Sequence, residues 1–190
     1  MNATPVPKVG AAVFLTLFCA LALAAPAAAG AAPEAQGGEI TPGKGVGPIT
    51  VGMPLEGLLR LWGTPQRKDR GQDGIDLYDY GEVRGVLAFL KEDRVAQLIV
   101  LTPAWSTPTG AKVGTTWPEV RAFLGQPDET PPGHTQDELR YWYKRRGIAF
   151  ILRGRTVAAI VVLAGVNEPA SHGFLDDLLE KGRGRGDGRR

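Results

Sequence analysis

Hydrophobic residues recur with a helical period at two places in the chain. In the first, apolar side chains follow the i, i+3, i+4, i+7 spacing that puts them on one face of a helix, at Leu55, Leu58, Leu59 and Trp62. In the second, the same stripe is formed by Trp117, Val120 and Leu124. The pattern therefore predicts two short amphipathic helices, each with one face turned to a core.

Glycine and proline residues mark the two ends of both predicted helices. Each stretch reads glycine, ten residues, glycine, one residue, proline. Proline suits the first helical turn, glycine after the last turn adopts the left-handed conformation that ends helices, and the second proline prevents continuation. Thr116 and Glu119 have the spacing of a capping box. The repeated signature consists of Gly52, Pro54, Gly63, Pro65, Gly114, Pro118, Gly125 and Pro127.

Strand-like segments follow each predicted helix in the same order. Three segments with strand patterns, at 75–80, 85–91 and 95–101, have counterparts at 139–143, 147–153 and 157–163. The offset is 62 residues at the helix start, the hairpin and the last strand (52 and 114, 85 and 147, 95 and 157). We therefore predict an internal duplication. The predicted fold class is α+β, with two tandem repeats of one helix and a three-stranded antiparallel sheet packed together, and a C-terminal helix.

Association of the two repeats has a physical reason. One unit of about 60 residues buries too little surface to be more than marginally stable alone. The last strand of each unit, at 97–101 and 158–163, is apolar on both faces. Since the helix covers only one face, a neighbouring unit or a partner is expected to cover the other.

The predicted organisation divides the chain into seven parts. These are a signal peptide at 1–30, a flexible spacer at 31–39, repeat 1 at 40–103 with a lead-in strand at 46–51, a linker at 104–112, repeat 2 at 113–165, a helix at 166–180 carrying Phe174, Leu175, Leu178 and Leu179, and a disordered basic tail at 181–190.

The N-terminus has the three parts of a secretory signal. Lys8 precedes an apolar run at 9–25, and small residues at 27–32 suit a signal peptidase. The run is too short for a comfortable membrane span, although an uncleaved anchor is the alternative. Phe18 before Cys19 argues against lipid attachment. Because Cys19 is the only cysteine, the mature chain is expected to be cysteine-free and secreted or periplasmic, with no transmembrane span after signal cleavage.

Charge excludes a nucleic-acid partner. The formal net charge of +2 arises in the last ten residues, which carry five basic side chains against one acidic. Without these and Lys8, 16 basic residues face 19 acidic ones, so the body is mildly acidic.

Reactive groups are sparse in the sequence. The two histidines, His134 and His172, have no other metal-ligand type at a suitable spacing, and motifs of serine hydrolases and zinc proteases are absent. We therefore expect no catalytic residues, no metal and no cofactor, and the protein is not expected to be an enzyme. The carboxylates Asp176-Asp177 and Asp128-Glu129 are the weak alternative for a catalytic pair.

Four tyrosines lie at equivalent positions of the two repeats. Tyr78 and Tyr80 share one face of their strand, and Tyr141 and Tyr143 share the equivalent face. These four residues are the candidate partner-binding surface, because tyrosine offers contact area at low entropic cost. The alternative is that the same side chains form the core beneath the helices.

The glycine and proline punctuation resembles a known unit. The Gly52-Met53-Pro54-Leu55-Glu56 start, the Gly63-Thr64-Pro65 exit and the three strands that follow are similar to outer-membrane assembly lipoproteins of the SmpA/OmlA type and to the secreted β-lactamase inhibitor protein. The latter is also a tandem of two such units after a signal peptide, and its sheets form a concave surface that grips the target. The resemblance covers about residues 46–165 and implies the same surface here. The mature part of the chain departs from the inhibitor in its lack of cysteines. The chain departs from the lipoproteins in lacking a lipidated cysteine and in being duplicated.

Together these features predict an exported, non-catalytic protein-binding module of the bacterial cell envelope or medium, with an unknown envelope or secreted protein as its partner. One alternative is an inhibitor of a secreted hydrolase, as the resemblance implies. Another is a small enzyme or ligand-binding protein that uses a groove between the repeats.

Overall fold

The computed structural model describes residues 37–71, 74–133 and 137–164. The fold is α+β, with a large antiparallel sheet and few helices. The helical elements are α1 (Leu55–Trp62), α2 (Gly81–Arg84), α3 (Trp117–Leu124) and a 3₁₀ turn at Lys144–Arg146. The predicted signal peptide, the spacer up to residue 36, the C-terminal helix at 166–180 and the basic tail lie outside the described residues.

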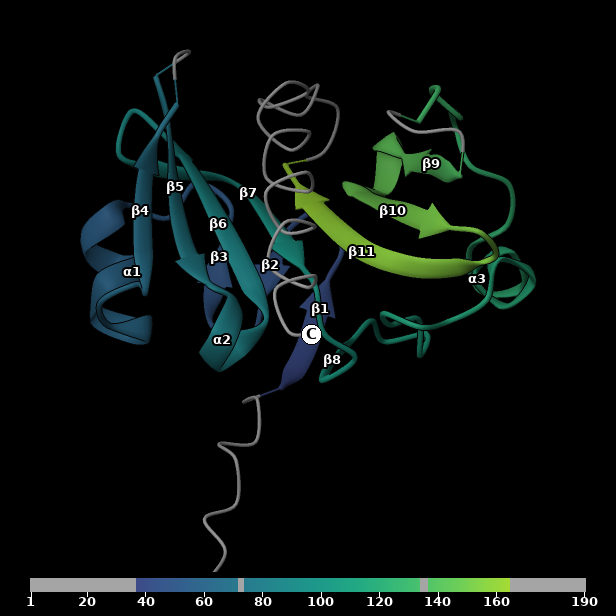
Figure 1. Ribbon diagram of the computed structural model, residues 1–190, viewed down its shortest axis with the longest axis horizontal. Coiled ribbons are helices and arrows are strands. Elements are labelled where there is room, and N and C mark those ends of the chain that lie inside the picture. The colour runs from purple at the N-terminus through teal and green to yellow at the C-terminus, as the bar shows by residue number, and fades with distance from the viewer. Residues whose placement is uncertain (1–36, 72–73, 134–136, 165–190) are drawn as a thin grey trace, which may run out of the picture. The chain divides into compact units, whose positions relative to one another are not determined.

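One seven-stranded antiparallel sheet forms the body of the fold (Figure 1). Its strands, in spatial order, are β4 (Arg67–Arg70), β5 (Ile75–Tyr80), β6 (Val86–Lys91), β7 (Arg94–Val100), β11 (Thr156–Leu163), β10 (Ile148–Arg153) and β9 (Glu138–Tyr143). The sequence predicted two separate three-stranded sheets. Instead, β7 pairs with β11, with Val100 opposite Ile160 and Gln97 opposite Leu163, so the strands of both halves form a single sheet.

A second, four-stranded sheet has the order β3-β2-β1-β8. It consists of β1 (Gly38–Thr41), β2 (Gly45–Val46), β3 (Ile49–Thr50) and β8 (Trp105–Ser106). The single lead-in strand predicted at 46–51 is therefore two short strands, because a turn with positive φ at Gly47 separates them. The predicted linker at 104–112 contains β8, and the Trp105 indole, 3% exposed, donates a hydrogen bond to the Arg84 carbonyl at 2.7 Å.

The helix ends follow the predicted signals with two differences. Pro54 is the N-cap of α1, so that helix starts at Leu55. The carboxylate of Glu119 accepts hydrogen bonds from the hydroxyl and the backbone N–H of Thr116, at 2.7 and 2.8 Å, and these bonds lower the Glu119 pKa. Gly63 has φ 76° and ψ −158°, a combination open almost only to glycine and distinct from the left-handed helical conformation predicted.

Equivalent backbone contacts recur in the two halves. Gly52 donates to the Val95 carbonyl at 2.6 Å, and Gly114 donates to the Val157 carbonyl at 2.8 Å. The register of the β6–β7 hairpin shifts between residues 89 and 90, and that of the β10–β11 hairpin shifts between residues 151 and 152. Gly85 and Gly147 both have φ 64° at the turn before the hairpin. These individual contacts thus recur at corresponding points of the two halves.

The seven-stranded sheet has two differently packed faces. We call the side that contacts α1, α3 and the small sheet the first face; its core includes Leu58 of α1 and Val120 of α3, both fully buried. The opposite side, the second face, carries a separate buried cluster. Its members are Ile75, Leu77, Leu87, Phe89, Ile99, Trp142, Ala149, Ile151, Ala159, Val161 and Leu163.

Candidate binding face

The four tyrosines do not form an exposed surface. Tyr78, Tyr80 and Tyr143 are 4%, 2% and 2% exposed and belong to the core of the first face. Tyr141 is half-buried and stacks on Trp117 of α3, with ring centroids 3.6 Å apart. The structure therefore corrects the predicted tyrosine surface: these rings lie on the face that the helices cover, as the core alternative had it.

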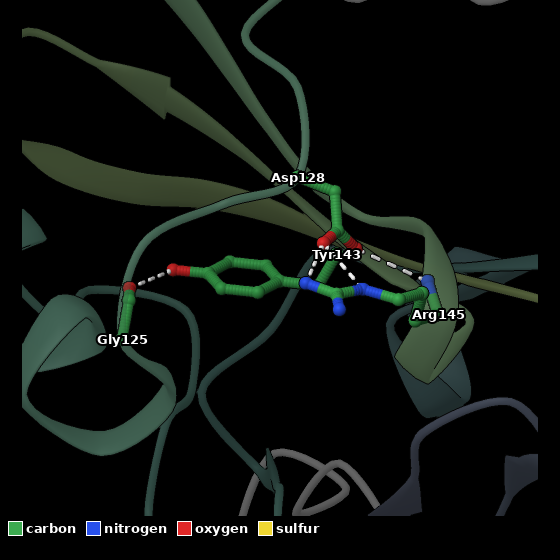
Figure 2. Close-up of polar contacts among 4 residues, drawn as sticks. All are labelled: Gly125, Asp128, Tyr143 and Arg145. Carbon is green, nitrogen blue, oxygen red and sulfur yellow. Dashed lines mark hydrogen bonds and ion pairs between the residues drawn. The ribbon is translucent and has the colours of Figure 1, made fainter.

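Two of these tyrosines hold the ends of the helices. The Tyr80 hydroxyl donates to the Gly63 carbonyl at 3.0 Å, and the Tyr143 hydroxyl donates to the Gly125 carbonyl at 2.9 Å (Figure 2). Gly63 and Gly125 are the C-cap residues of α1 and α3, whose terminal carbonyls have no partner within the helix. Each phenol thus ties a helix end to a strand, which explains why tyrosine stands at both positions.

A second polar contact lies beside the Tyr143 contact in Figure 2. The Asp128 carboxylate accepts hydrogen bonds from the side chain of Arg145, at 2.8 Å from Nε, and from its backbone N–H, at 3.1 Å. These hydrogen bonds lower the Asp128 pKa and raise that of Arg145. Both carboxylate oxygens of Asp128 are therefore engaged by Arg145. These contacts give no support to the alternative of a catalytic role for Asp128.

Ionisation of Tyr80 should make stability fall at alkaline pH. Burial raises its pKa from 10.0 to about 12. The phenol is neutral in the folded and unfolded states below pH 10, but above pH 10 the unfolded state ionises first. The free energy of unfolding is therefore expected to fall between pH 10 and 12. Denaturant titrations across this range should show a shallower fall for Tyr80→Phe than for the wild type. An equal slope in both proteins would contradict the assignment.

The second face is apolar almost throughout. All eleven members of its cluster are at most 8% exposed, and all of them come from strands of the seven-stranded sheet. Within residues 37–71, 74–133 and 137–164, no helix contributes to this cluster. An apolar sheet face of this extent is typical of a surface that another chain segment or a partner covers.

Gln97 interrupts this apolar face at its centre. It lies opposite Phe89 of β6 and Leu163 of β11, both members of the second-face cluster, so its side chain shares their side of the sheet. Gln97 is 1% exposed, and neither its Nε2 nor its Oε1 makes a hydrogen bond. A buried amide without a partner costs about 1–3 kcal/mol, so the group calls for an explanation.

A buried ion pair marks one end of the second face. On β9, Arg140 Nε and Glu138 Oε1 are 2.8 Å apart, and the two side chains are 5% and 3% exposed. Both residues alternate in step with Trp142, which places them on the second face. At the other end, on β4, Arg67 and Asp69 form an exposed pair at 2.8 Å. The apolar centre therefore lies between two pairs of opposite charges.

A groove on the other side of the sheet is the candidate small-molecule site. It has a volume of about 610 Å³ and is lined by Thr50, Met53, Pro54, Glu56, Gly57 and Arg60. All six residues belong to the first half, at the start of α1, so this groove does not lie between the repeats, where the sequence alternative placed a ligand. Among the described residues, no group of three or more His, Cys, Asp or Glu side chains has a metal-binding arrangement.

Sequence reasoning missed Gln97, although a signal was present. Gln97 is the one polar side chain between Val95 and Leu101 in the stretch Val-Ala-Gln-Leu-Ile-Val-Leu. A lone amide in an otherwise apolar run is informative, because burying it without a partner is costly.

The helical segments of the described part include none long and apolar enough to cross a lipid bilayer.

Comparisons with known proteins give fold likeness only. No family model matches the chain, and there is no significant match among curated proteins. Solved structures that match include an extracellular SCP-domain protein from Bacillus anthracis, with 14% identity, a TM-score of 0.46 and coverage of 60% of this chain and 43% of that one. The uncharacterised protein YfeY from Escherichia coli has 11% identity, a TM-score of 0.46 and coverage of 63% and 96%. A DUF4309 family protein from Bacillus subtilis has 17% identity, a TM-score of 0.46 and coverage of 64% and 88%. Likenesses of this strength indicate nothing about activity or partners.

Proposed function

We propose that the chain is an exported, non-catalytic protein-binding module built from two tandem α+β repeats, and that it binds its partner through the second face. The recurring contacts of the two halves, such as Gly52 to Val95 and Gly114 to Val157, support the duplication. The signal sequence supports export to the periplasm or the medium. The likeness to the SmpA/OmlA and β-lactamase inhibitor units belongs to the same proposal, since each half runs from one helix into antiparallel strands.

The unpartnered amide of Gln97 is the observation that carries the binding proposal. An amide presents both a donor and an acceptor, which match the acceptor and donor of one peptide group. Phe89 and Ile99 beside Gln97, and Trp142 further along the same face, supply the apolar and aromatic contacts typical of a protein interface. A partner that inserts an extended loop, whose peptide groups are not already paired as they are in a helix, would satisfy Gln97 and explain why the fold retains a costly polar group there.

Gln97→Met should separate stability from binding. The thioether side chain has nearly the same shape and needs no hydrogen bond, so the free energy of unfolding is expected to rise by about 1–3 kcal/mol. Binding is expected to weaken about tenfold, which corresponds to about 1.4 kcal/mol. Chemical denaturation measures the first effect. Retention of envelope or culture-medium proteins on the immobilised chain, followed by titration of the retained protein, measures the second.

Glu56→Gln is the matched control for this experiment, because Glu56 lies on α1, on the other side of the sheet. It should change neither binding nor stability appreciably. A partner held equally by wild type and Gln97→Met would contradict the proposed face. Titration against β-lactamase and protease activities tests the alternative of hydrolase inhibition, in which case enzyme activity should fall in proportion to added wild-type chain and less with Gln97→Met.

A further inference from the structure

We propose that the segment at 170–180 of this same chain occupies the second face in the free protein and is displaced when a partner binds. The inference deepens the proposed function, because it concerns how the same face is regulated. It rests on the burial of the face, on the point where the chain leaves the sheet and on the sequence beyond that point.

The burial of the second face needs a cover. Phe89 and Ile99 are each 0% exposed, and Val161 is 4% exposed, although they project from the side of the sheet that lacks α1 and α3. Within residues 37–71, 74–133 and 137–164, all side chains in this cluster come from the sheet itself. A single sheet layer does not bury its own outer face, so the occupant comes from elsewhere.

The last strand of the sheet ends at a residue of the second face. The last strand, β11, lies in the interior of the sheet beside the central strand β7, and its final residue Leu163 is a member of the second-face cluster. From there to Phe174 is a stretch of about ten residues, whose root-mean-square span is about 18 Å if flexible. A segment tethered at this distance has an effective concentration in the millimolar range at the face. Intramolecular docking therefore needs only modest intrinsic affinity.

The sequence at 170–180 suits such an occupant. At 100° per residue, one half of a helix carries Phe174, Leu175, Leu178 and Leu179. Asp176, Asp177 and Glu180 fall on the opposite half. A helix with four large apolar side chains on one side and three carboxylates on the other would cover the apolar centre and keep its charges in water. A modest intramolecular affinity would suffice for docking and would suit exchange for a partner.

The protection of a cysteine on the second face from a thiol reagent tests whether the segment at 170–180 covers that face, and it needs no partner protein. Ala159→Cys places a reporter on the second face, and Ala88→Cys places a matched reporter on the first face, where Ala159 and Ala88 are 2% and 0% exposed. Each is made in the full chain on a Cys19→Ser background, since Cys19 is the only other cysteine. The rate of reaction with a thiol reagent is measured with the native segment and with Leu175→Asp/Leu178→Asp.

We expect the double substitution to speed labelling of Ala159→Cys by about tenfold or more and to leave that of Ala88→Cys unchanged. A synthetic peptide of residues 166–182 added in excess should restore protection. Unchanged labelling at Ala159→Cys would overturn the proposal, and so would protection that depends on protein concentration, because a second copy would then be the cover. If both reporters react faster, the milder Phe174→Ala is used, which should still raise labelling at the second face alone; failure to do so overturns the proposal.

This outcome is separable from the proposed function. Labelling reports the intramolecular cover whether or not a partner is found. If a partner is found, Leu175→Asp/Leu178→Asp should bind it more tightly than the wild type, because the competent fraction of the face rises. If the double substitution speeds labelling but no partner is found, the proposed intramolecular cover is supported and only the proposed binding module is refuted.

Discussion

Neither residues 31–103 nor residues 104–190, expressed alone, are expected to fold into a stable unit. The first-face core is one cluster that draws Val100 and Leu98 from the first half and Ile160 and Phe150 from the second. Cutting the chain removes the β7–β11 pairing and exposes both sides of this cluster. A fragment of this size buries too little surface to offset its conformational entropy. Circular dichroism and thermal unfolding should show no cooperative transition for either fragment.

Contacts outside the main sheet make the same cut costly. The Gly43 N–H donates to the Gly147 carbonyl at 3.1 Å, which joins the turn after β1 to the turn before β10. β8, from beyond residue 103, pairs in parallel with β1. Mixing the two fragments is the control, since complementation should restore a transition whose midpoint depends on concentration. A sharp transition in one fragment alone would contradict the interdependence of the halves.

Tyr78→Ala is expected to lower the free energy of unfolding by about 3–5 kcal/mol, the range found for removing a buried aromatic side chain. Tyr78 is 4% exposed and packs in the first-face core, and the Lys68 amine lies 4.5 Å from its ring centroid. The substitution removes the ring and leaves a cavity beneath the helix layer. Denaturant titration followed by fluorescence and circular dichroism measures the loss.

Tyr141→Ala is the matched comparison for Tyr78→Ala. Tyr141 is half-buried and packs against the core from its edge, where its ring stacks on Trp117. Its removal is expected to cost clearly less, with the lost stacking contributing about 0.5–1.5 kcal/mol. Little effect at Tyr78 would mean that its ring faces solvent, as the surface hypothesis held. Equally large losses at both positions would contradict the difference in packing between Tyr78 and Tyr141.

Local signals in the sequence were sufficient for α1, α3 and the two hairpins, but not for the short α2. The apolar stripe and its bounding glycines placed α1 and α3, and the strand patterns at 85–91 and 95–101, with their counterparts at 147–153 and 157–163, placed the hairpins. These features depend on neighbouring residues, so a single sequence contains them. The constant offset of 62 residues was visible for the same reason.

Long-range pairing was not available from those signals. β7 and β11 are apolar on both faces, so no alternation marks which side or edge each strand turns to its neighbour. Period-two alternation showed that Tyr78 and Tyr80 share a face but not which face the helix covers. β4 reads Arg-Lys-Asp-Arg and lacks apolar alternation, and β8 has only two residues, so neither resembled a strand.

Both borders of the seven-stranded sheet are closed to further strands. β4, at one border, presents four consecutive charged side chains, which disfavour pairing with another chain. At the other border, residues 128–132 lie along β9, where Trp142 donates to the Glu129 carbonyl at 2.9 Å and Pro132 pairs with Leu139. Since proline offers no donor, that segment is itself a poor template. Growth into fibrils by strand addition is therefore disfavoured at both borders.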